Sequence, residues 1–207
     1  MNIIIDNMKP KRVITLLISA FIISAIFLAG CGKDTPSPTD TQYAAATATK
    51  LGISFSFEYP ITYGKITPDA FEDTGGDHSV SLLYGRPGNT SDKADKQIYI
   101  IALDPIESRM NAAAWMAEHI RLLEKNDPAF KLIERSTIQI GSIDGYVTAY
   151  HSSILGNYLS SDYLITWDAY VDYNGYIWKI AVMGIEELAE EVKPDFEHLI
   201  QSFEFLN

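Results

Sequence analysis

Residues 163–180 read YLITWDAYVDYNGYIWKI, and this segment decides the fold because it contains two strands joined by a tight turn. The pair Asn174-Gly175 favours the two-residue turn of an antiparallel hairpin, in which both central residues take a positive φ. Aromatic and β-branched residues, which strands prefer, lie on both sides of the pair. The segment therefore predicts a β-hairpin whose strands cover residues 163–171 and 176–183.

The first strand of this hairpin places alternate residues on opposite faces of a sheet. One face is apolar, and we expect it to pack against the core. Its members are Tyr163, Ile165, Trp167, Ala169 and Val171. The other face carries Asp168, Tyr170 and Asp172, and we expect it to be solvated. Paired carboxylates can also perform acid–base chemistry or bind cations, so that alternative stays open at this point.

Tyr and Trp side chains crowd into 21 residues of this region. They are Tyr158, Tyr163, Trp167, Tyr170, Tyr173, Tyr176 and Trp178. Such residues are frequent at recognition surfaces, although they are also good strand formers. Because Trp167 falls on the expected core face, the candidate binding residues are Tyr158, Tyr170 and Tyr173.

Outward from the hairpin, further segments show the alternation of strands or the spacing of helices. Strands are predicted at residues 53–60, 80–84, 98–103, 130–140 and 146–152, with a turn at residues 142–145. A helix capped by Ser108 is predicted to end at Asn126-Asp127-Pro128. A second helix is predicted over residues 188–203, followed by a short edge strand. Antiparallel hairpins combined with two substantial helices predict an α+β fold.

The N-terminus has the organisation of a secretory signal. Lys9, Lys11 and Arg12 form a basic cluster, and residues 13–29 are uncharged and mostly apolar. The motif Leu28-Ala29-Gly30-Cys31 then resembles the bacterial lipobox. This resemblance implies that a diacylglyceryl group is attached to the Cys31 thiol and that the chain is cleaved before this residue. The alternative is an uncleaved transmembrane helix, for which the 17 residues of the apolar run are barely enough.

The chain is thus expected to have a signal peptide at residues 1–30, a flexible tether at residues 31–50 and one globular domain at residues 51–207. The tether is rich in Thr, Ser, Pro and Ala and shows no apolar periodicity. Loss of the signal removes three of the 16 basic and one of the 27 acidic residues, which leaves a net charge near −13. That acidity argues against nucleic acid and against an electrostatic membrane-binding surface, so the lipid must hold the protein at the membrane.

Five segments recur in the order of a known family. They are the strand Phe55-Ser56-Phe57-Glu58-Tyr59-Pro60, the helix around Trp115, the hairpin Ile143-Asp144-Gly145-Tyr146, the strand Gly175-Tyr176-Ile177-Trp178-Lys179-Ile180 and the closing helix with Phe196 and Ile200-Gln201-Ser202-Phe203. Over residues 51–207 the chain resembles PsbP-like proteins, a superfamily that includes the extrinsic photosystem II subunit, a Ran-binding nuclear import factor and many small bacterial lipoproteins. The resemblance implies a central antiparallel sheet flanked by helices in α/β/α layers. It also implies protein binding, and it supplies no shared catalytic residues.

A search for catalytic motifs finds no G-x-x-x-x-G-K-[ST], no G-x-S-x-G and no H-E-x-x-H. Because Cys31 is the only cysteine, the domain has no disulfide, thiolate metal site or thiol nucleophile. The loop Asp73-Thr74-Gly75-Gly76-Asp77-His78 has ligands for a divalent ion, but a solvated loop is the expectation. No metal and no cofactor is predicted.

These features predict a bacterial lipoprotein that is anchored through Cys31 on the extracytoplasmic side of the cell membrane. Its domain is expected to serve as a non-catalytic protein-binding or accessory module, with another envelope protein as partner. The alternative is a small-ligand-binding lipoprotein for transport or sensing, which a pocket with aromatic walls and convergent polar groups would support. A hydrolase is the third possibility, and it would require a nucleophile, a base and an orienting group that meet in space.

Overall fold

The computed structural model describes residues 41–63, 78–88, 93–103, 110–153, 159–161 and 163–206. The chain divides into two units, residues 1–40 and 41–207, and every described residue belongs to the second. The expected signal and lipobox, the polar loop that precedes His78 and the candidate Tyr158 lie outside the described residues. Within those residues, no helix has the length and apolar character needed to cross a membrane.

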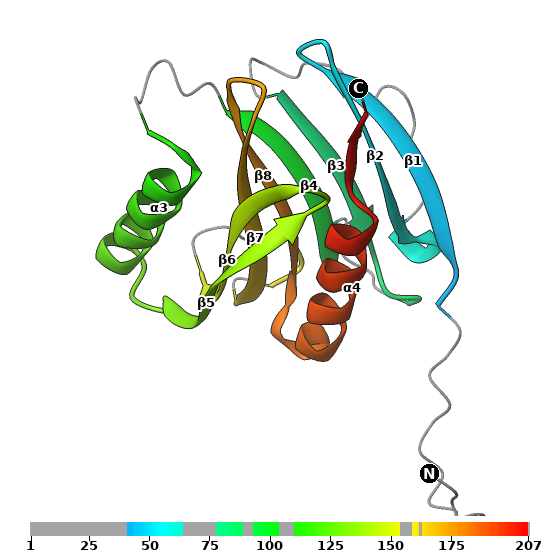
Figure 1. Cartoon of the computed structure of the whole chain (residues 1–207). Coiled ribbons are helices and arrows are strands. Elements are labelled where there is room, and N and C mark those ends of the chain that lie inside the picture. Colours follow the sequence, from blue (N-terminus) through cyan, green and yellow to red (C-terminus); the bar gives the residue numbers. More distant parts are fainter. Residues whose placement is uncertain are drawn as a thin grey trace, which may run out of the picture. The chain divides into compact units, whose positions relative to one another are not determined.

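A six-stranded antiparallel sheet forms the centre of the domain (Figure 1). Its strand order is β3-β4-β8-β7-β6-β5, with the bounds His78–Tyr84, Lys96–Leu103, Tyr176–Ile185, Leu164–Tyr173, Ile143–Ser152 and Lys131–Ile140. The predicted hairpin is β7-β8, and its Asn174 and Gly175 have φ values of 50° and 82°, as a type I′ turn requires. Because this hairpin occupies the two middle positions of the sheet, other elements must pack on both of its faces to shield them from solvent.

The turn between β5 and β6 lies earlier than predicted. It uses Gly141 and Ser142, with Gly141 at a φ of 60°, and not Asp144 and Gly145. Gly145 instead lies inside β6, where a Cβ would be only 2.5 Å from Cγ1 of Val171 on β7. The glycine is therefore explained by close packing between two strands.

A second, three-stranded sheet has the order β1-β2-β9, with the bounds Tyr43–Lys50, Ile53–Pro60 and Glu204–Leu206. The expected tether is wrong over residues 43–50, because this segment pairs with β2 along its whole length. Leu51 and Gly52 form the connecting turn, with φ values of 54° and 75°. An alanine-rich segment has little strand preference of its own, so pairing with a neighbour decides its conformation.

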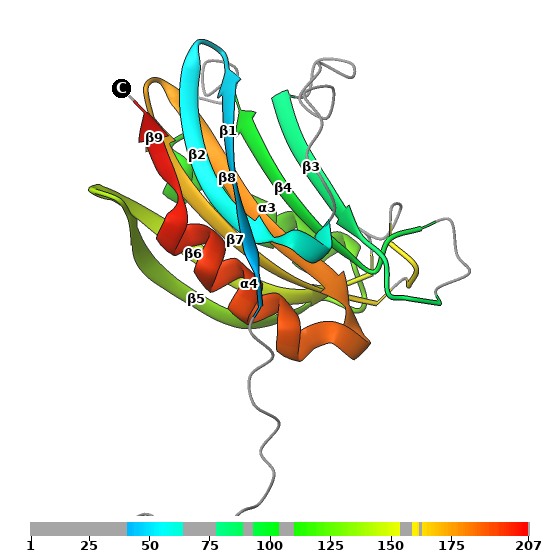
Figure 2. The ribbon, with the colours of Figure 1, turned by 90° about the vertical axis from the view of Figure 1, so that its right-hand side faces the viewer.

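The small sheet and helix α4 (Ala189–Ser202) together cover one face of the large sheet (Figures 1 and 2). Two short 3-10 helices, Ile61–Tyr63 and Glu186–Leu188, follow β2 and β8. The shared core is aromatic at its centre, with buried Phe55, Phe57, Trp178, Phe196 and Phe203. Burial of these large side chains is the main source of stability on this side of the sheet.

Helix α3 (Ala112–Asn126) packs on the opposite face, over β6 and β7 (Figure 1). Its cap is Asn111, whose Oδ1 accepts a hydrogen bond from the Ala114 N–H at 2.9 Å, and not the predicted Ser108. The predicted solvated face of β7 is also wrong, because Asp168 and Tyr170 on this face are completely buried. Solvation holds only at the end of the strand, where Asp172 is exposed.

The predicted class, an α+β fold with a central antiparallel sheet flanked by helices, is confirmed. One layer differs from the expected α/β/α arrangement, because β1, β2 and β9 lie in the same layer as α4 (Figure 2). The predicted short final strand is β9, which pairs with β2. Both faces of β7 are covered, so alternation along this strand does not distinguish a core face from a solvent face.

Candidate functional site

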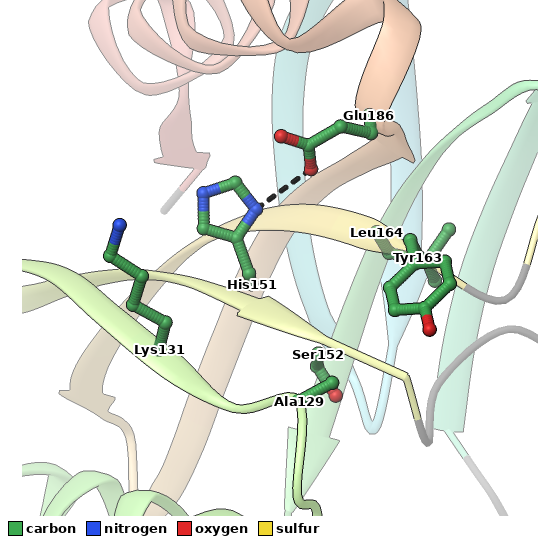
Figure 3. Close-up of a pocket in the computed structure, with 7 residues that line it drawn as sticks. All are labelled: Ala129, Lys131, His151, Ser152, Tyr163, Leu164 and Glu186. Carbon is green, nitrogen blue, oxygen red and sulfur yellow. Dashed lines mark hydrogen bonds and ion pairs between the residues drawn. The ribbon is translucent and has the colours of Figure 1, made fainter.

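A pocket of about 330 Å³ lies where β5 begins and β6 ends (Figure 3). Four segments contribute its lining, which comprises Ala129, Lys131, His151, Ser152, Tyr163, Leu164 and Glu186. Lys131 and His151 are register partners on neighbouring strands, so their side chains extend from the same face. The Glu186 N–H donates to the Tyr163 carbonyl at 3.2 Å, which holds the beginning of β7 against the end of β8.

The three polar side chains at one side of the pocket, Lys131, His151 and Glu186, are paired unequally. Nδ1 of His151 lies 2.8 Å from Oε2 of Glu186, and since a carboxylate only accepts, the imidazole donates through Nδ1. Lys131 forms no ion pair with any residue in the described part of the chain. Lys131 is therefore the one lysine or arginine of the lining, and it is not ion-paired with Glu186.

Tyr163 forms one wall of the pocket, and its side chain lies on the opposite side of the imidazole from Lys131 (Figure 3). The residue is 65% exposed, which corrects the prediction that it shares the core face of the strand. The physical reason is that β7 begins at Leu164, so the alternation of the strand does not extend to Tyr163.

Two residues of the pocket lining are bound to Asp127, a buried carboxylate in the turn before β5. It accepts hydrogen bonds from the Ser152 hydroxyl at 2.7 Å, the Ser153 hydroxyl at 2.6 Å, the Ser153 N–H at 2.7 Å and the Ala129 N–H at 2.9 Å. Burial alone would raise the pKa of Asp127, but these hydrogen bonds stabilise the charged form and lower the pKa to about 2. Two lining residues, Ala129 and Ser152, are thereby fixed in position.

The described residues of the pocket do not form a serine triad. A serine triad requires the serine hydroxyl to donate to the imidazole. Ser152 is the hydroxyl next to His151 in the pocket lining, and it donates to Asp127 instead. The hydrolase alternative therefore gains no support from this geometry.

Strand β5 borders the pocket and forms one edge of the large sheet. Its residues 131–137 are all exposed, including Leu132 at 40% and Ile133 at 45%. The pairing with β6 shifts between Leu132 and Glu134, so Ile133 occupies a β-bulge. A second pocket, of about 520 Å³, opens at the far end of the strand and is lined by Thr137, Ile138, Gln139, Asp144, Gly145 and Tyr146.

A separate polar network surrounds the Asp168 carboxylate in the middle of the large sheet. Its Oδ2 accepts from Lys179 Nζ at 2.9 Å, from the Tyr150 hydroxyl at 2.8 Å and from the Tyr170 hydroxyl at 2.8 Å. The Tyr99 hydroxyl donates to Oδ1 over a longer distance of 3.4 Å. All five side chains are buried, so this network stabilises the interior and does not present a site to solvent.

Helix α3 contributes His119 to the edge of this network. Its Nε2 lies 3.2 Å from the Tyr150 hydroxyl. Burial, reinforced by the positive charge of Lys179, lowers the pKa of His119 to about 4, so the imidazole is neutral at pH 7. Burial and the nearby Asp168 carboxylate also raise the pKa values of the phenols well above their usual range; these are Tyr99, Tyr150 and Tyr170.

The predicted site residues have different outcomes. Cys31 and Tyr158 lie outside the described residues. Tyr170 is wholly buried, so its prediction as a surface residue is wrong. Tyr173 is half-buried and stacks on Phe205 with ring centroids 3.9 Å apart, and it stays a candidate. Within the described ranges, no group of three or more His, Cys, Asp or Glu residues is placed to hold a metal ion.

Sequence reasoning misses the pocket because its members are far apart in the chain. Lys131, His151, Tyr163 and Glu186 follow no spacing that a motif could represent. They meet only because the ends of neighbouring strands reach the same end of the sheet. The sole local signal is the concentration of tyrosines near residue 163.

No protein-family model matches this sequence, and no curated protein matches it. Solved structures do share its fold. LpqN of Mycobacterium tuberculosis, involved in cell envelope biogenesis, is similar with a TM-score of 0.51 and 12% identity, over 81% of this chain and 94% of LpqN. The Ran-binding protein Mog1p of Saccharomyces cerevisiae has a TM-score of 0.50 and 11% identity, over 79% of this chain and 95% of Mog1p.

A third structure, cyanobacterial PsbP from Synechocystis, has a TM-score of 0.47 and 13% identity, over 86% of this chain and 99% of that protein. The expected resemblance is therefore confirmed at the level of the fold, on the basis of the mycobacterial and yeast proteins.

Proposed function

We propose that this chain is a lipid-anchored module of a bacterial cell envelope, and that it binds another protein through the exposed strand β5. The observation that carries the proposal is the exposure of seven consecutive residues at one edge of the large sheet. Similarity of fold to a Ran-binding protein and to an envelope protein supports a binding role by analogy. The proposal assigns no catalytic step to the domain.

The edge of β5 is suited to strand addition, in which an extended peptide pairs with the free side of a sheet. Proteins usually protect such an edge with charges, bulges or a covering element. Here a bulge is present at Ile133, yet the aliphatic side chains of Leu132 and Ile133 both stay exposed. Two neighbouring aliphatic side chains at an open edge give an incoming strand apolar contacts in addition to main-chain hydrogen bonds.

The charge of the strand indicates the chemistry of the partner. Arg135 is exposed and makes no ion pair with any described residue. A second copy of this domain is a poor occupant, because two chains with net charges near −13 repel each other. The occupant we propose is an extended segment of a different envelope protein, with an acidic side chain opposite Arg135.

Anchoring through Cys31 supports the same role. One acyl chain gives only marginal attachment to a membrane, whereas two chains give a stable anchor. A tether that ends before β1 leaves residues 31–42 between the lipid and the domain. A flexible chain of this length has a root-mean-square reach of roughly 20 Å, which restricts the search for a partner to the region close to the membrane.

Site-specific photo-crosslinking in native membranes tests the proposal. A photoreactive amino acid replaces Ile133 on β5 in one variant and Leu122 on helix α3 in the other. The two positions are a matched pair, since their side chains are 45% and 42% exposed. We expect a discrete crosslinked protein from position 133 and none from position 122.

Introduction of a charge into the edge provides the complementary test. Leu132→Asp should abolish the crosslink from position 133, while Leu122→Asp should leave it unchanged. An acidic segment should also lose affinity for Arg135→Glu. Equal crosslinking from both positions, or a crosslink that survives Leu132→Asp, would exclude β5 as the binding edge.

A further inference from the structure

We infer that the pocket at the beginning of β5 is a binding site for a small, elongated monocarboxylate with a flat apolar end. The site adjoins the proposed protein-binding edge and shares Lys131 with it, but neither Ile133 nor Arg135 belongs to its lining. At about 330 Å³ it lies within the size range of small-molecule sites.

Lys131 provides the charge that would hold the carboxylate. The Glu186 carboxylate accepts the His151 N–H at 2.8 Å, so it has a hydrogen-bond partner other than Lys131. Lys131 has no ion-pair partner among the residues that the structure describes. Figure 3 shows the Lys131 side chain beside the imidazole, on the side away from Tyr163. A carboxylate at this end would form a charge-assisted hydrogen bond with the ammonium group.

Tyr163 provides the surface for the apolar end of the ligand. The residue is 65% exposed, and its ring lies at the opposite side of the pocket, next to the buried Leu164 (Figure 3). A flat group placed on this ring would remove apolar surface from water and gain the energy of aromatic stacking. Because Lys131 and Tyr163 stand at opposite ends, the ligand must carry its charge and its flat group at opposite ends as well.

The surrounding charge limits the ligand to a single carboxylate. Lys131 offsets one negative charge, whereas the chain as a whole is strongly acidic and the lining also contains Glu186, whose side chain is 54% exposed. A second negative charge on the ligand would meet only repulsion. Inorganic phosphate and dicarboxylates should therefore bind more weakly than a monocarboxylate of the same size.

Titration calorimetry on the full-length chain in detergent micelles tests the inference, with sodium 3-phenylpropionate as the probe. We expect saturable one-to-one binding that is about tenfold weaker for Lys131→Gln, because one charge-assisted hydrogen bond is lost. Tyr163→Ala should weaken binding about fivefold. The neutral analogue 3-phenylpropanamide should bind the native chain no better than the acid binds Lys131→Gln, and inorganic phosphate should give no saturable heat.

Lys125→Gln is the matched control, since it removes an exposed lysine from helix α3, away from the pocket lining. It should bind the probe with native affinity, and all three variants should keep the native melting temperature because the substituted side chains are exposed. Absence of saturable binding by the native chain overturns the inference. Equal affinity of the native chain and Lys131→Gln, or of the acid and its amide, overturns it as well.

Discussion

At the scale of single residues, the Asp168 carboxylate is the most consequential group in the interior. It is completely buried, and a lysine and two phenols donate to one of its oxygens over distances of 2.8–2.9 Å. A buried charge is tolerated only when it is paired and hydrogen-bonded in this way. The network therefore makes the stability of the domain sensitive to the loss of any one partner.

Removal of Lys179 should expose this sensitivity. Lys179→Met leaves the Asp168 carboxylate buried without its counter-charge, and we expect the free energy of unfolding to fall by about 3–5 kcal/mol. Urea unfolding followed by tryptophan fluorescence measures the change. The double variant Asp168→Asn/Lys179→Met should be more stable than the single one, because it buries no isolated charge. The control is Lys193→Met, which breaks an exposed ion pair with Glu197 and should lower the free energy of unfolding by at most about 0.5 kcal/mol. An equally small loss for Lys179→Met would contradict the prediction.

His119 should make stability depend on pH. The pKa of His119 is about 4 in the folded chain, whereas an imidazole in the unfolded chain has the ordinary value of 6.5. As the pH falls, the unfolded chain therefore binds the proton before the folded chain does. The contribution of neutral His119 to the free energy of unfolding is fully present above pH 6.5. It is lost as the pH falls from 6.5 towards 4, by about 3 kcal/mol in total. In the variant His119→Asn, the free energy of unfolding should depend less steeply on pH between 6.5 and 4. Asp127 acts separately below pH 3.8, since its pKa is lowered to about 2. An unchanged slope between pH 6.5 and 4 in the variant would exclude the assignment.

At the scale of elements, helix α3 is attached to the sheet by polar contacts at its beginning and middle. At the beginning of the helix, the two carboxylate oxygens of Asp172 accept from the Ala112 N–H at 3.0 and 3.1 Å. In the middle of the helix, His119 forms a hydrogen bond with the Tyr150 hydroxyl. A short apolar cluster that includes Met116 completes the contact. The position of the helix thus depends on specific partners as well as on burial.

The β6-β7 pair depends on a residue without a side chain. In Gly145→Ala the new Cβ would lie 2.5 Å from Val171 Cγ1 and 3.0 Å from the Tyr170 carbonyl oxygen, and we expect a loss of about 1–3 kcal/mol. Thermal unfolding measures it. Gly85→Ala is the matched control, because no atom lies within 4 Å of the position that its new methyl group would take. Val171→Ala in the Gly145→Ala background should restore part of the loss, and equal melting temperatures for the two glycine variants would refute the clash.

Much of the element structure is predictable because it depends on local chemistry. The Asn174-Gly175 turn follows from the φ values that few residues other than Asn and Gly adopt easily. The second helix, predicted over residues 188–203, spans Ala189–Ser202 in the structure, since a single apolar stripe specifies it. Strand β1 is not predicted from the sequence, because its conformation comes from pairing with β2 and not from its own alanine-rich sequence.

At the scale of the whole molecule, the strong negative charge and the proposed lipid act together. Negative charge keeps copies of the domain apart and away from anionic headgroups, which is why we propose attachment through a lipid on Cys31. The exposed edge of β5 and the pocket beside it would then both face the space near the membrane. Neither surface requires the domain itself to enter the bilayer.

Labelling of cells with a fatty-acid analogue tests the anchor. The native chain should incorporate label and sediment with membranes, whereas Cys31→Ser should do neither, because the thiol is the proposed acceptor of the lipid. The control is a serine-to-alanine change within the tether, Ser37→Ala, which keeps the cysteine and should be labelled normally. Equal incorporation by the native chain and Cys31→Ser would rule out a lipid on this residue.

Features that depend on neighbouring residues follow from the sequence without further information, namely the central hairpin, the apolar stripe of α4 and the α+β class. Which faces are buried depends on the tertiary structure, because cover over a strand comes from segments distant in the chain. For this reason Asp168 and Tyr170 are interior, although their alternation resembles a solvated face. For the same reason Lys131 and Tyr163 share a pocket across 32 residues of sequence, since only the packing of strand ends brings them together.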